Sequence, residues 1–223
     1  GITCALQDAH ARYGISSGLI LSFLRHLSEE DALKTWQEAQ PYRDKFIGVG
    51  LDSSELGHPP SKFKNVFALA RAANMKLVAH AGEEGPADYI WDALDSLQID
   101  RVDHGNRSLE DPTLIQRLID EKKVLTVCPL SNDRLQVVKN ITDHPLQKML
   151  DLGLYATVNS DDPAYFGGYM NENFEAIQAA LNLTANDIKT LTINAINGSF
   201  ISNERKAVLH QDVELHHQKF ARG

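Results

Sequence analysis

Six short apolar runs recur along the chain, and each ends in polar or charged residues. The runs are "GLILSFLR", "FIGVGLD", "KLVAH", "RVDH", "VLTVCPLSN" and "LYATVNSD", and their ends lie 24 to 29 residues apart. Runs of this length, bounded by polar residues, are typical of buried parallel strands. The spacing leaves room for one helix between successive strands.

Segments with helical character fill the intervals between the runs. They are "SEEDALKTWQEAQ", "SKFKNVFALARAAN", "PADYIWDALDSLQ", "DPTLIQRLIDEKK" and "HPLQKMLDLG". Ser28, Ser61 and Asp111 are expected N-caps, Pro112 follows Asp111 at the first helical position, and Gly153 closes the last segment. The alternation of strand and helix predicts an α/β protein with a parallel sheet.

Two architectures produce this alternation: an open doubly wound sheet and a closed (β/α)8 TIM barrel. The barrel is favoured because polar groups follow every strand, and a barrel gathers them all at one mouth. A complete barrel has eight units and about 250 residues, whereas six units are visible. Residues 2–13 already form a predicted helix directly after Gly1. We therefore expect residues 1–223 to be a single barrel domain that lacks about its first two units, which would precede Gly1.

After the last run, "DPAYFGGYMNENFEAIQAALNL" predicts a loop and a helix, and a second helix begins with Thr184 and Asp187 as a capping box. Beyond it, His216 and His217 stand in a polar terminal segment and are expected to be solvated. No further strand is predicted there.

Composition adds the class of protein. Of the 223 residues, 43% are hydrophobic, enough for one sizeable core. The formal charge of −8, from 30 acidic and 22 basic residues, is spread along the chain and disfavours nucleic acid or an anionic membrane as partner. Only Cys4 and Cys128 could form disulfides, and neither a membrane-spanning run nor a signal peptide is visible. These features predict a cytoplasmic protein.

The strongest candidates for chemistry follow three of the strands. They are His80 with Glu83 in "KLVAHAGEEG", His104 in "RVDH", and the pair Asp161 and Asp162 in "NSDDP". Each residue alone could have a purely structural role. The histidines could stabilise the fold, Glu83 could be a solvated loop residue, and "NSDDP" could be a helix cap. Their shared position at the same end of successive strands favours a catalytic zinc site, in which protein ligands leave one position for water.

Other motifs do not fit their usual structural context. "GISSG" precedes a strand instead of forming a nucleophile elbow, and "GVGLDS" lacks the third glycine of a dinucleotide fingerprint. "CPLSN" lacks the second cysteine of the cytidine deaminase signature. These classes are disfavoured.

Taken in order, "AHAGEE", "RVDHGN", "CPLSN" and "NSDDPAYF" resemble the adenosine/adenine deaminase family, which are metal-dependent barrels of the amidohydrolase type. The resemblance covers nearly the whole chain. "GLDSSELGHPP" and "DDPAYFGGY" are more similar to the adenine deaminase branch than to the nucleoside branch.

The resemblance implies a zinc-dependent hydrolysis of a 6-aminopurine, most similar to conversion of adenine to hypoxanthine and ammonia in purine salvage. One Zn²⁺ per site would be bound by His80 and Asp161, from the fifth and eighth strands of the family's barrel. His104 would hold and deprotonate the water that attacks C6 of the purine.

The same resemblance implies substrate contacts. Glu83 would donate a proton to ring N1, which requires a carboxyl group whose pKa is raised by a desolvated pocket. Asp162 would accept a hydrogen bond from purine N7 or its protonated form, and Gly82 would let the backbone pass close to the ligand.

One departure from the family is clear. The family carries a His-x-His pair on its first strand as two further zinc ligands, and no His-x-His occurs in this chain. Its absence agrees with the strand count, so we expect full activity in a longer parent protein. The alternatives are an adenosine or modified-aminopurine deaminase, and a catalytically inactive purine-binding fragment. The sequence predicts a small-molecule purine partner and leaves the oligomeric state open.

Overall fold

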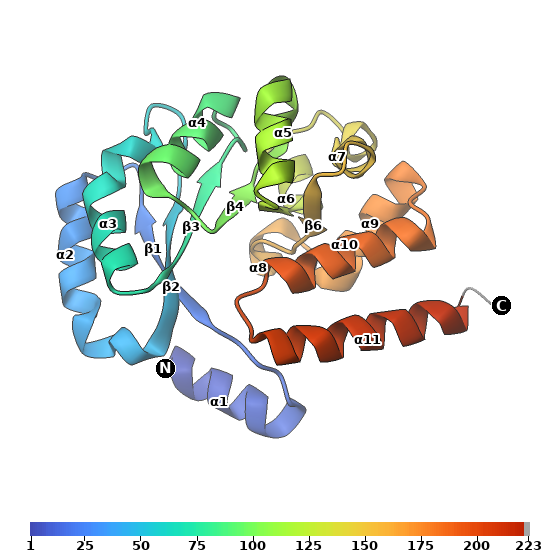
Figure 1. The fold of residues 1–223 in the computed structure, drawn as a ribbon, viewed down its shortest axis with the longest axis horizontal. Helices are drawn as coiled ribbons and strands as arrows, with labels where there is room; N and C mark the ends of the chain where they lie inside the picture. The colour runs from blue at the N-terminus through green and yellow to red at the C-terminus, as the bar shows by residue number, and fades with distance from the viewer. Residues whose placement is uncertain (221–223) are drawn as a thin grey trace.

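A computed structural model of the protein describes residues 1–220, and its centre is one parallel sheet of six strands (Figure 1). The strands pair in chain order, β1 beside β2 through to β6. They are β1 (Leu19–Leu24), β2 (Phe46–Asp52), β3 (Lys76–Ala81), β4 (Arg101–His104), β5 (Val124–Val127) and β6 (Tyr155–Val158). Every pairing is parallel, so the predicted α/β class is confirmed.

Helices connect successive strands and cover the sheet. The principal ones are α2 (Glu29–Ala39), α3 (Lys64–Ala72), α4 (Ala87–Asp92), α5 (Pro112–Asp120), α7 (Leu146–Asp151) and α10 (Ala185–Gly198). Parallel strands paired in chain order, each followed by a helix, form the repeating unit of a (β/α)8 barrel. The chain supplies six such units, as the sequence predicts.

The remaining elements lie in the connections and at the chain ends. They are α1 (Ile2–Tyr13), α6 (Pro129–Arg134), α8 (Pro163–Phe166), α9 (Met170–Leu181), α11 (Asn203–Phe220) and short turns at Gln40–Lys45, Pro60–Phe63, Ala93–Leu97, Asn106–Glu110 and Ile141–Asp143. Within residues 1–220, none of the helices has both the length and the apolar character needed to span a bilayer.

Several helix starts confirm the predicted capping. The Ser28 side chain accepts a hydrogen bond from the backbone of Asp31, and Thr184 pairs reciprocally with Asp187. Asp111 accepts from the backbone N–H groups of the first turn of α5. These side chains satisfy N–H groups that have no partner inside the helix.

Ser61 is not an N-cap, and this prediction was wrong. It lies inside the short 3₁₀ turn Pro60–Phe63, and α3 begins only at Lys64. The backbone N–H of Ser61 donates instead to the Asp92 carboxylate at 2.7 Å. A contact from a distant element therefore replaces the local cap.

One other segment differs from the expectation, and the polar terminal segment forms an element that the sequence did not assign. The run ending at Asn132 is a strand only to Val127, because Pro129 opens helix α6 and cannot donate to a strand ladder. The polar terminal segment forms the long helix α11, in which His216 is exposed and its ring lies 2.8 Å from the Asp212 carbonyl oxygen.

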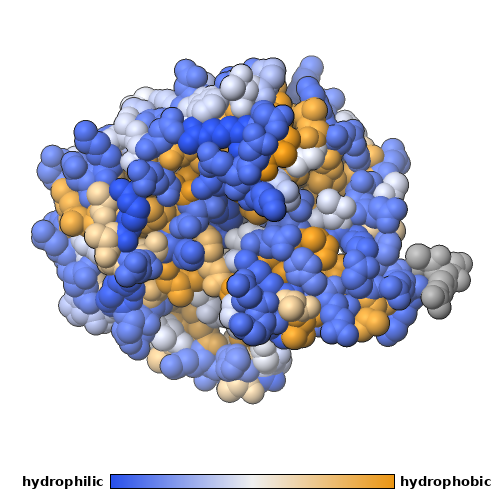
Figure 2. Space-filling model, viewed as in Figure 1, coloured by the Kyte–Doolittle hydropathy of each residue, from blue (hydrophilic) through white to orange (hydrophobic). Residues whose placement is uncertain are grey.

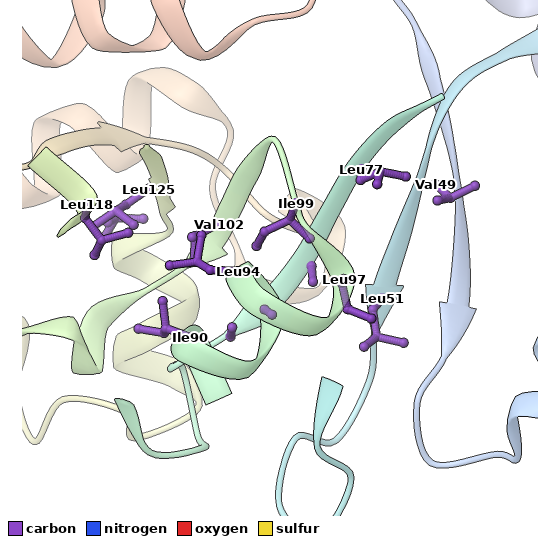
Figure 3. Close-up of a cluster of buried hydrophobic side chains, with 14 of the residues drawn as sticks. Val49, Leu51, Leu77, Ile90, Leu94, Leu97, Ile99, Val102, Leu118 and Leu125 are labelled. Atoms are coloured by element: carbon purple, nitrogen blue, oxygen red, sulfur yellow. The ribbon is translucent and has the colours of Figure 1, made fainter. Parts of the chain in front are cut away.

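The main core lies between the sheet and its helices (Figure 3). Its labelled side chains are each at most 4% exposed: Val49, Leu51, Leu77, Ile90, Leu94, Leu97, Ile99, Val102, Leu118 and Leu125. Burial of a side chain of this size stabilises the fold by about 1.5–3 kcal/mol. On the surface, apolar residues are interspersed with hydrophilic ones (Figure 2).

Strand alternation gives the sheet a second, polar face. On β3, Leu77 and Ala79 belong to the core cluster, so His80 points to the opposite face. On β4, Val102 is in the core and Asp103 lies opposite, where it accepts a hydrogen bond from Thr126 of β5 at 2.7 Å. The candidate residues are carried by this polar face and by the loops that follow it.

Candidate active site

The two candidate histidines meet at the carboxyl ends of neighbouring strands. The ring centroids of His80 and His104 are 4.5 Å apart, with an interplanar angle of 82°. By strand alternation His104 would share the core face of Val102. Its φ of 66°, unusual for a residue other than glycine, breaks the alternation and brings the ring beside His80.

His104 is almost fully buried, at 2% exposure. Its Nδ1 atom lies 3.4 Å from Glu83 Oε1 and has no hydrogen-bond partner among the described residues. Burial lowers the pKa of His104 well below its usual range, and the neighbouring His80 lowers the pKa further. The imidazole is therefore neutral near pH 7, with a buried nitrogen available to bind a ligand.

Glu83 is also buried, at 8% exposure. Burial raises the pKa of this carboxyl group to about 7, with His80 opposing the rise and Asp161 adding to it. Asn132 Nδ2 donates a hydrogen bond to Glu83 Oε1 at 3.2 Å. Glu83 therefore fits the expectation of a carboxyl group that carries a proton near neutrality.

The loop between His80 and Gly85 is held at both ends by a buried ion pair. Arg25 and Glu55 are 0% and 1% exposed, with Nη1 and Oε1 3.6 Å apart. Arg25 donates to the carbonyl oxygen of His80 at 2.6 Å, and Glu55 accepts from the backbone N–H of Gly85. Burial lowers the pKa of Arg25 from its ordinary value, yet the group stays charged because that value is so high.

Gly82 stands at the turn of this loop with a φ of 71°. A Cβ atom at this position would lie 2.5 Å from Ile90 Cδ1, so packing and backbone conformation both favour glycine. The predicted approach of Gly82 to substrate stays a prediction.

Asp161 and Asp162 are separated by the structure. Asp161, with a φ of 55°, lines a cavity of about 340 Å³ together with His80 and His104. Asp162 is exposed at the N-cap of α8 and is not among the residues lining that cavity. The structure thus brings together His80, Glu83, His104 and Asp161, while Asp162 stays outside.

The donor atoms present fit a zinc ion. One nitrogen or oxygen from each of His80, Glu83 and His104 lies within 4.8 Å of the others, and a second group joins His104, Cys128 and Asp161. Zinc prefers nitrogen, oxygen and thiolate ligands. Burial raises the pKa of Cys128 well above its usual range, and its thiol donates to the Thr126 carbonyl oxygen, so Cys128 stays a neutral thiol unless a metal binds it.

Three residues that contact the site were not predicted as functional from the sequence. Asp52, at the end of β2, has its Oδ1 3.6 Å from His80 Nε2. Asn132 in "CPLSN" contacts Glu83 from α6, and His144 lies behind Asn132. Asp52 and Asn132 are the last residues of two apolar runs, so their positions could have identified them. No local pattern in the sequence identifies His144.

Histidines and carboxylates gathered at the carboxyl ends of parallel β/α strands are the arrangement found in metal-dependent barrel enzymes. The family model described as adenosine deaminase matches residues 1–215, and the chain belongs to this family.

Its relatives include proteins named adenine deaminase. That of Rhodospirillum rubrum is 63% identical over 210 residues, which cover 94% of this chain and 63% of the relative. That of Acinetobacter baylyi is 59% identical over 206 residues, which cover 92% of this chain and 62% of the relative. The chain therefore spans about 63% of the length of the first of these curated relatives.

Solved structures agree in fold. The crystal structure of adenine deaminase from Arthrobacter aurescens superposes with a TM-score of 0.94 at 45% identity, covering 100% of this chain and 67% of the other. An amidohydrolase from Burkholderia ambifaria, described with bound Zn, has a TM-score of 0.92 at 30% identity. The match covers 99% of this chain and 62% of the other.

Proposed function

We propose that this protein catalyses the zinc-dependent hydrolytic deamination of adenine to hypoxanthine and ammonia, a reaction of purine salvage. One observation carries the proposal: donor atoms of His80, Glu83 and His104 lie within 4.8 Å of one another at the ends of adjacent strands, and Asp161 lines the same cavity as the two histidines. The choice of adenine is supported by the relatives named adenine deaminase, at up to 63% identity.

His80 and Asp161 are the proposed zinc ligands within this chain, through an imidazole nitrogen and a carboxylate oxygen. Zinc, when bound, lowers the pKa of a water molecule toward about 7 and so supplies a nucleophile at neutral pH. The identity of the metal as zinc is proposed together with these ligands.

His104 and Glu83, both buried, have opposite roles in proton transfer: one accepts a proton and the other donates one. His104 is neutral because burial lowers its pKa, so it can accept the proton that the attacking water loses as its oxygen bonds to C6. Glu83, whose pKa is raised to about 7, donates its proton to N1 so that negative charge does not accumulate on the ring. The C6–N bond then breaks as the amino group takes the proton held by His104 and leaves as ammonia, and the hydroxyl proton on C6 restores the acid form of Glu83.

Two further contacts with the purine belong to the proposal. Asp162 accepts a hydrogen bond from N7 when that nitrogen carries a hydrogen, which requires this exposed side chain to turn toward the ring when substrate binds. Gly82 allows the ring to lie close to the loop backbone because it has no side chain.

Ammonia release from adenine and from adenosine, with and without a zinc chelator, tests the proposal. We expect turnover of adenine, little turnover of adenosine, and loss of activity with the chelator that added Zn²⁺ restores. Faster turnover of adenosine would make the protein a nucleoside deaminase. Purine binding without any ammonia in the presence of Zn²⁺ would support an inactive purine-binding fragment.

The proposal includes a cytoplasmic location and a small-molecule purine as partner. Neither nucleic acid nor membrane is expected as a partner, because the formal charge is −8.

A further inference from the structure

A chain of buried hydrogen bonds runs behind Glu83, through two side chains that the proposed reaction does not use. The backbone N–H of Leu146 donates to His144 Nδ1 at 3.1 Å. His144 Nε2 lies 3.2 Å from Asn132 Oδ1, and Asn132 Nδ2 donates to Glu83 Oε1 at 3.2 Å. Asn132 is 0% exposed and His144 is 4% exposed, so water does not compete for these bonds.

The direction of each bond follows from the one before it. A backbone N–H can only donate, so His144 Nδ1 must accept from Leu146. A neutral imidazole has a single N–H, which in this ring is therefore on Nε2 and donates to Asn132 Oδ1. Burial lowers the pKa of His144 to about 4, which agrees with a neutral ring.

The orientation of the Asn132 amide is fixed by the same logic. Its Oδ1 atom also accepts from Asn106 Nδ2 at 2.7 Å, so two donors converge on the carbonyl oxygen. A flipped amide would place its NH₂ group against both donors. The NH₂ group of Asn132 must therefore point toward Glu83.

We propose that His144 and Asn132 are positioning residues that decide which oxygen of Glu83 carries its proton. The inference rests on the proposed function, because it assigns a role to the proton donor of that reaction. Oε1 accepts from the Asn132 amide, which favours the proton on Oε2, and Oε2 is then the oxygen that would donate to purine N1.

The same bond assists the transfer. When the Oε2–H bond breaks and the N1–H bond forms, Glu83 gains a negative charge, and the N–H donor of Asn132 stabilises the carboxylate. Hydrogen bonds to a charged acceptor are roughly twice as strong as those to a neutral one. The interaction is therefore stronger after the transfer than before it, which is the condition for accelerating the step.

Matched variants of His144 test the relay in the zinc-loaded protein with adenine as substrate. His144→Leu removes the donor to Asn132, whereas His144→Gln provides an amide N–H near the position of Nε2. We expect kcat to fall about 10- to 100-fold in His144→Leu with KM changed less than about 3-fold, because a misplaced catalytic group lowers the rate more than binding. His144→Gln should stay within about 3-fold of the wild-type kcat.

Asn132→Asp gives a second test, because it replaces the donor at Glu83 with an acceptor of the same shape. A carboxylate there attracts the Glu83 proton to Oε1, and we expect kcat to fall at least about 100-fold. Thermal unfolding of each variant identifies any that do not fold. A His144→Leu variant that folds and matches the wild-type kcat, or equal losses in His144→Leu and His144→Gln, would overturn the inference.

One measurement does not depend on activity. In ¹⁵N-histidine NMR spectra of the wild-type protein at pH 7, we expect His144 to be neutral with its proton on Nε2. A charged ring, or a proton on Nδ1, would contradict the relay even if the enzyme is active. No turnover of any aminopurine by the wild type, together with the Nε2–H form, would refute the proposed function and leave the hydrogen-bond chain intact.

Discussion

The buried environment of Glu83 determines whether its carboxyl group carries a proton near neutral pH. Its carboxyl group is 8% exposed, and burial raises its pKa to about 7. Sequence patterns marked Glu83 because it follows His80 by three residues after a strand. The pattern could not show the desolvation, which comes from the elements packed around the carboxyl group.

Replacement of Glu83 by glutamine tests its role as proton donor. The amide keeps the size of the side chain and can still accept from Asn132, but it has no acidic proton. We expect kcat for adenine to fall about 10²- to 10⁴-fold, the usual contribution of a general acid, while adenine still binds. Ammonia release and calorimetric binding measure the two effects, and unchanged turnover would remove Glu83 from the mechanism.

His144 should make the protein less stable in acid. The pKa of His144 in the folded state is about 4, below the ordinary value of 6.5. The unfolded chain therefore takes up the proton more readily, and stability that is fully present above pH 6.5 is lost as the pH falls toward 4. The whole effect is about 3 kcal/mol, since one pKa unit corresponds to about 1.4 kcal/mol.

Urea unfolding at pH 7 and pH 4.5 checks this expectation. His144→Gln, which cannot be protonated in this range, should lose less stability between the two pH values than the wild type. An equal loss in both proteins would show that other groups, such as the buried His104, cause the acid sensitivity.

At the scale of elements, local sequence predicted the starts of three helices, α2, α5 and α10, which begin with side-chain caps. The capping box of Thr184 and Asp187 opens α10, a helix that packs against β5 and β6. Ser61 shows the limit of this reasoning, because the Asp92 carboxylate of a different helix takes its backbone N–H. A cap can be predicted where its partners lie within the same turn, and it fails where a distant side chain competes.

Thr184→Ala should destabilise the protein by about 1 kcal/mol, the usual cost of losing an N-cap side chain. Thr190→Ala is the matched control, since Thr190 is exposed within the same helix and its hydroxyl only donates to the Asn186 carbonyl oxygen. The free energies of unfolding in urea are compared. Equal effects in the two variants would show that the cap contributes nothing measurable.

For the whole molecule, stability resides in the layer between the sheet and its helices. Leu118 of α5 is 0% exposed within this core. Leu118→Ala should lower the free energy of unfolding by about 2–5 kcal/mol, through lost burial and the cavity left behind. Leu69→Ala in α3 is the control, because Leu69 is 47% exposed and should change stability by less than about 0.5 kcal/mol.

Metal binding should also stabilise the whole molecule if the proposed ligands hold zinc. An ion that binds the folded state and not the unfolded state raises the apparent stability in proportion to the logarithm of its concentration. We expect added Zn²⁺ to raise the melting temperature, and His80→Ala with Asp161→Ala to abolish the rise. A rise that persists in the double variant would indicate that zinc binds elsewhere.

The sequence by itself determined the order of six strands and their helices, and the end of the sheet at which the candidate residues stand. Both follow from local rules, the periodicity of apolar residues and the alternation of side chains along a strand. Only the tertiary structure decided which candidates meet. His104 turns toward His80 through a positive φ, Asp162 stays outside the cavity, and Asn132 reaches Glu83 from 49 residues away. These outcomes depend on long-range packing and desolvation, which no short stretch of sequence contains.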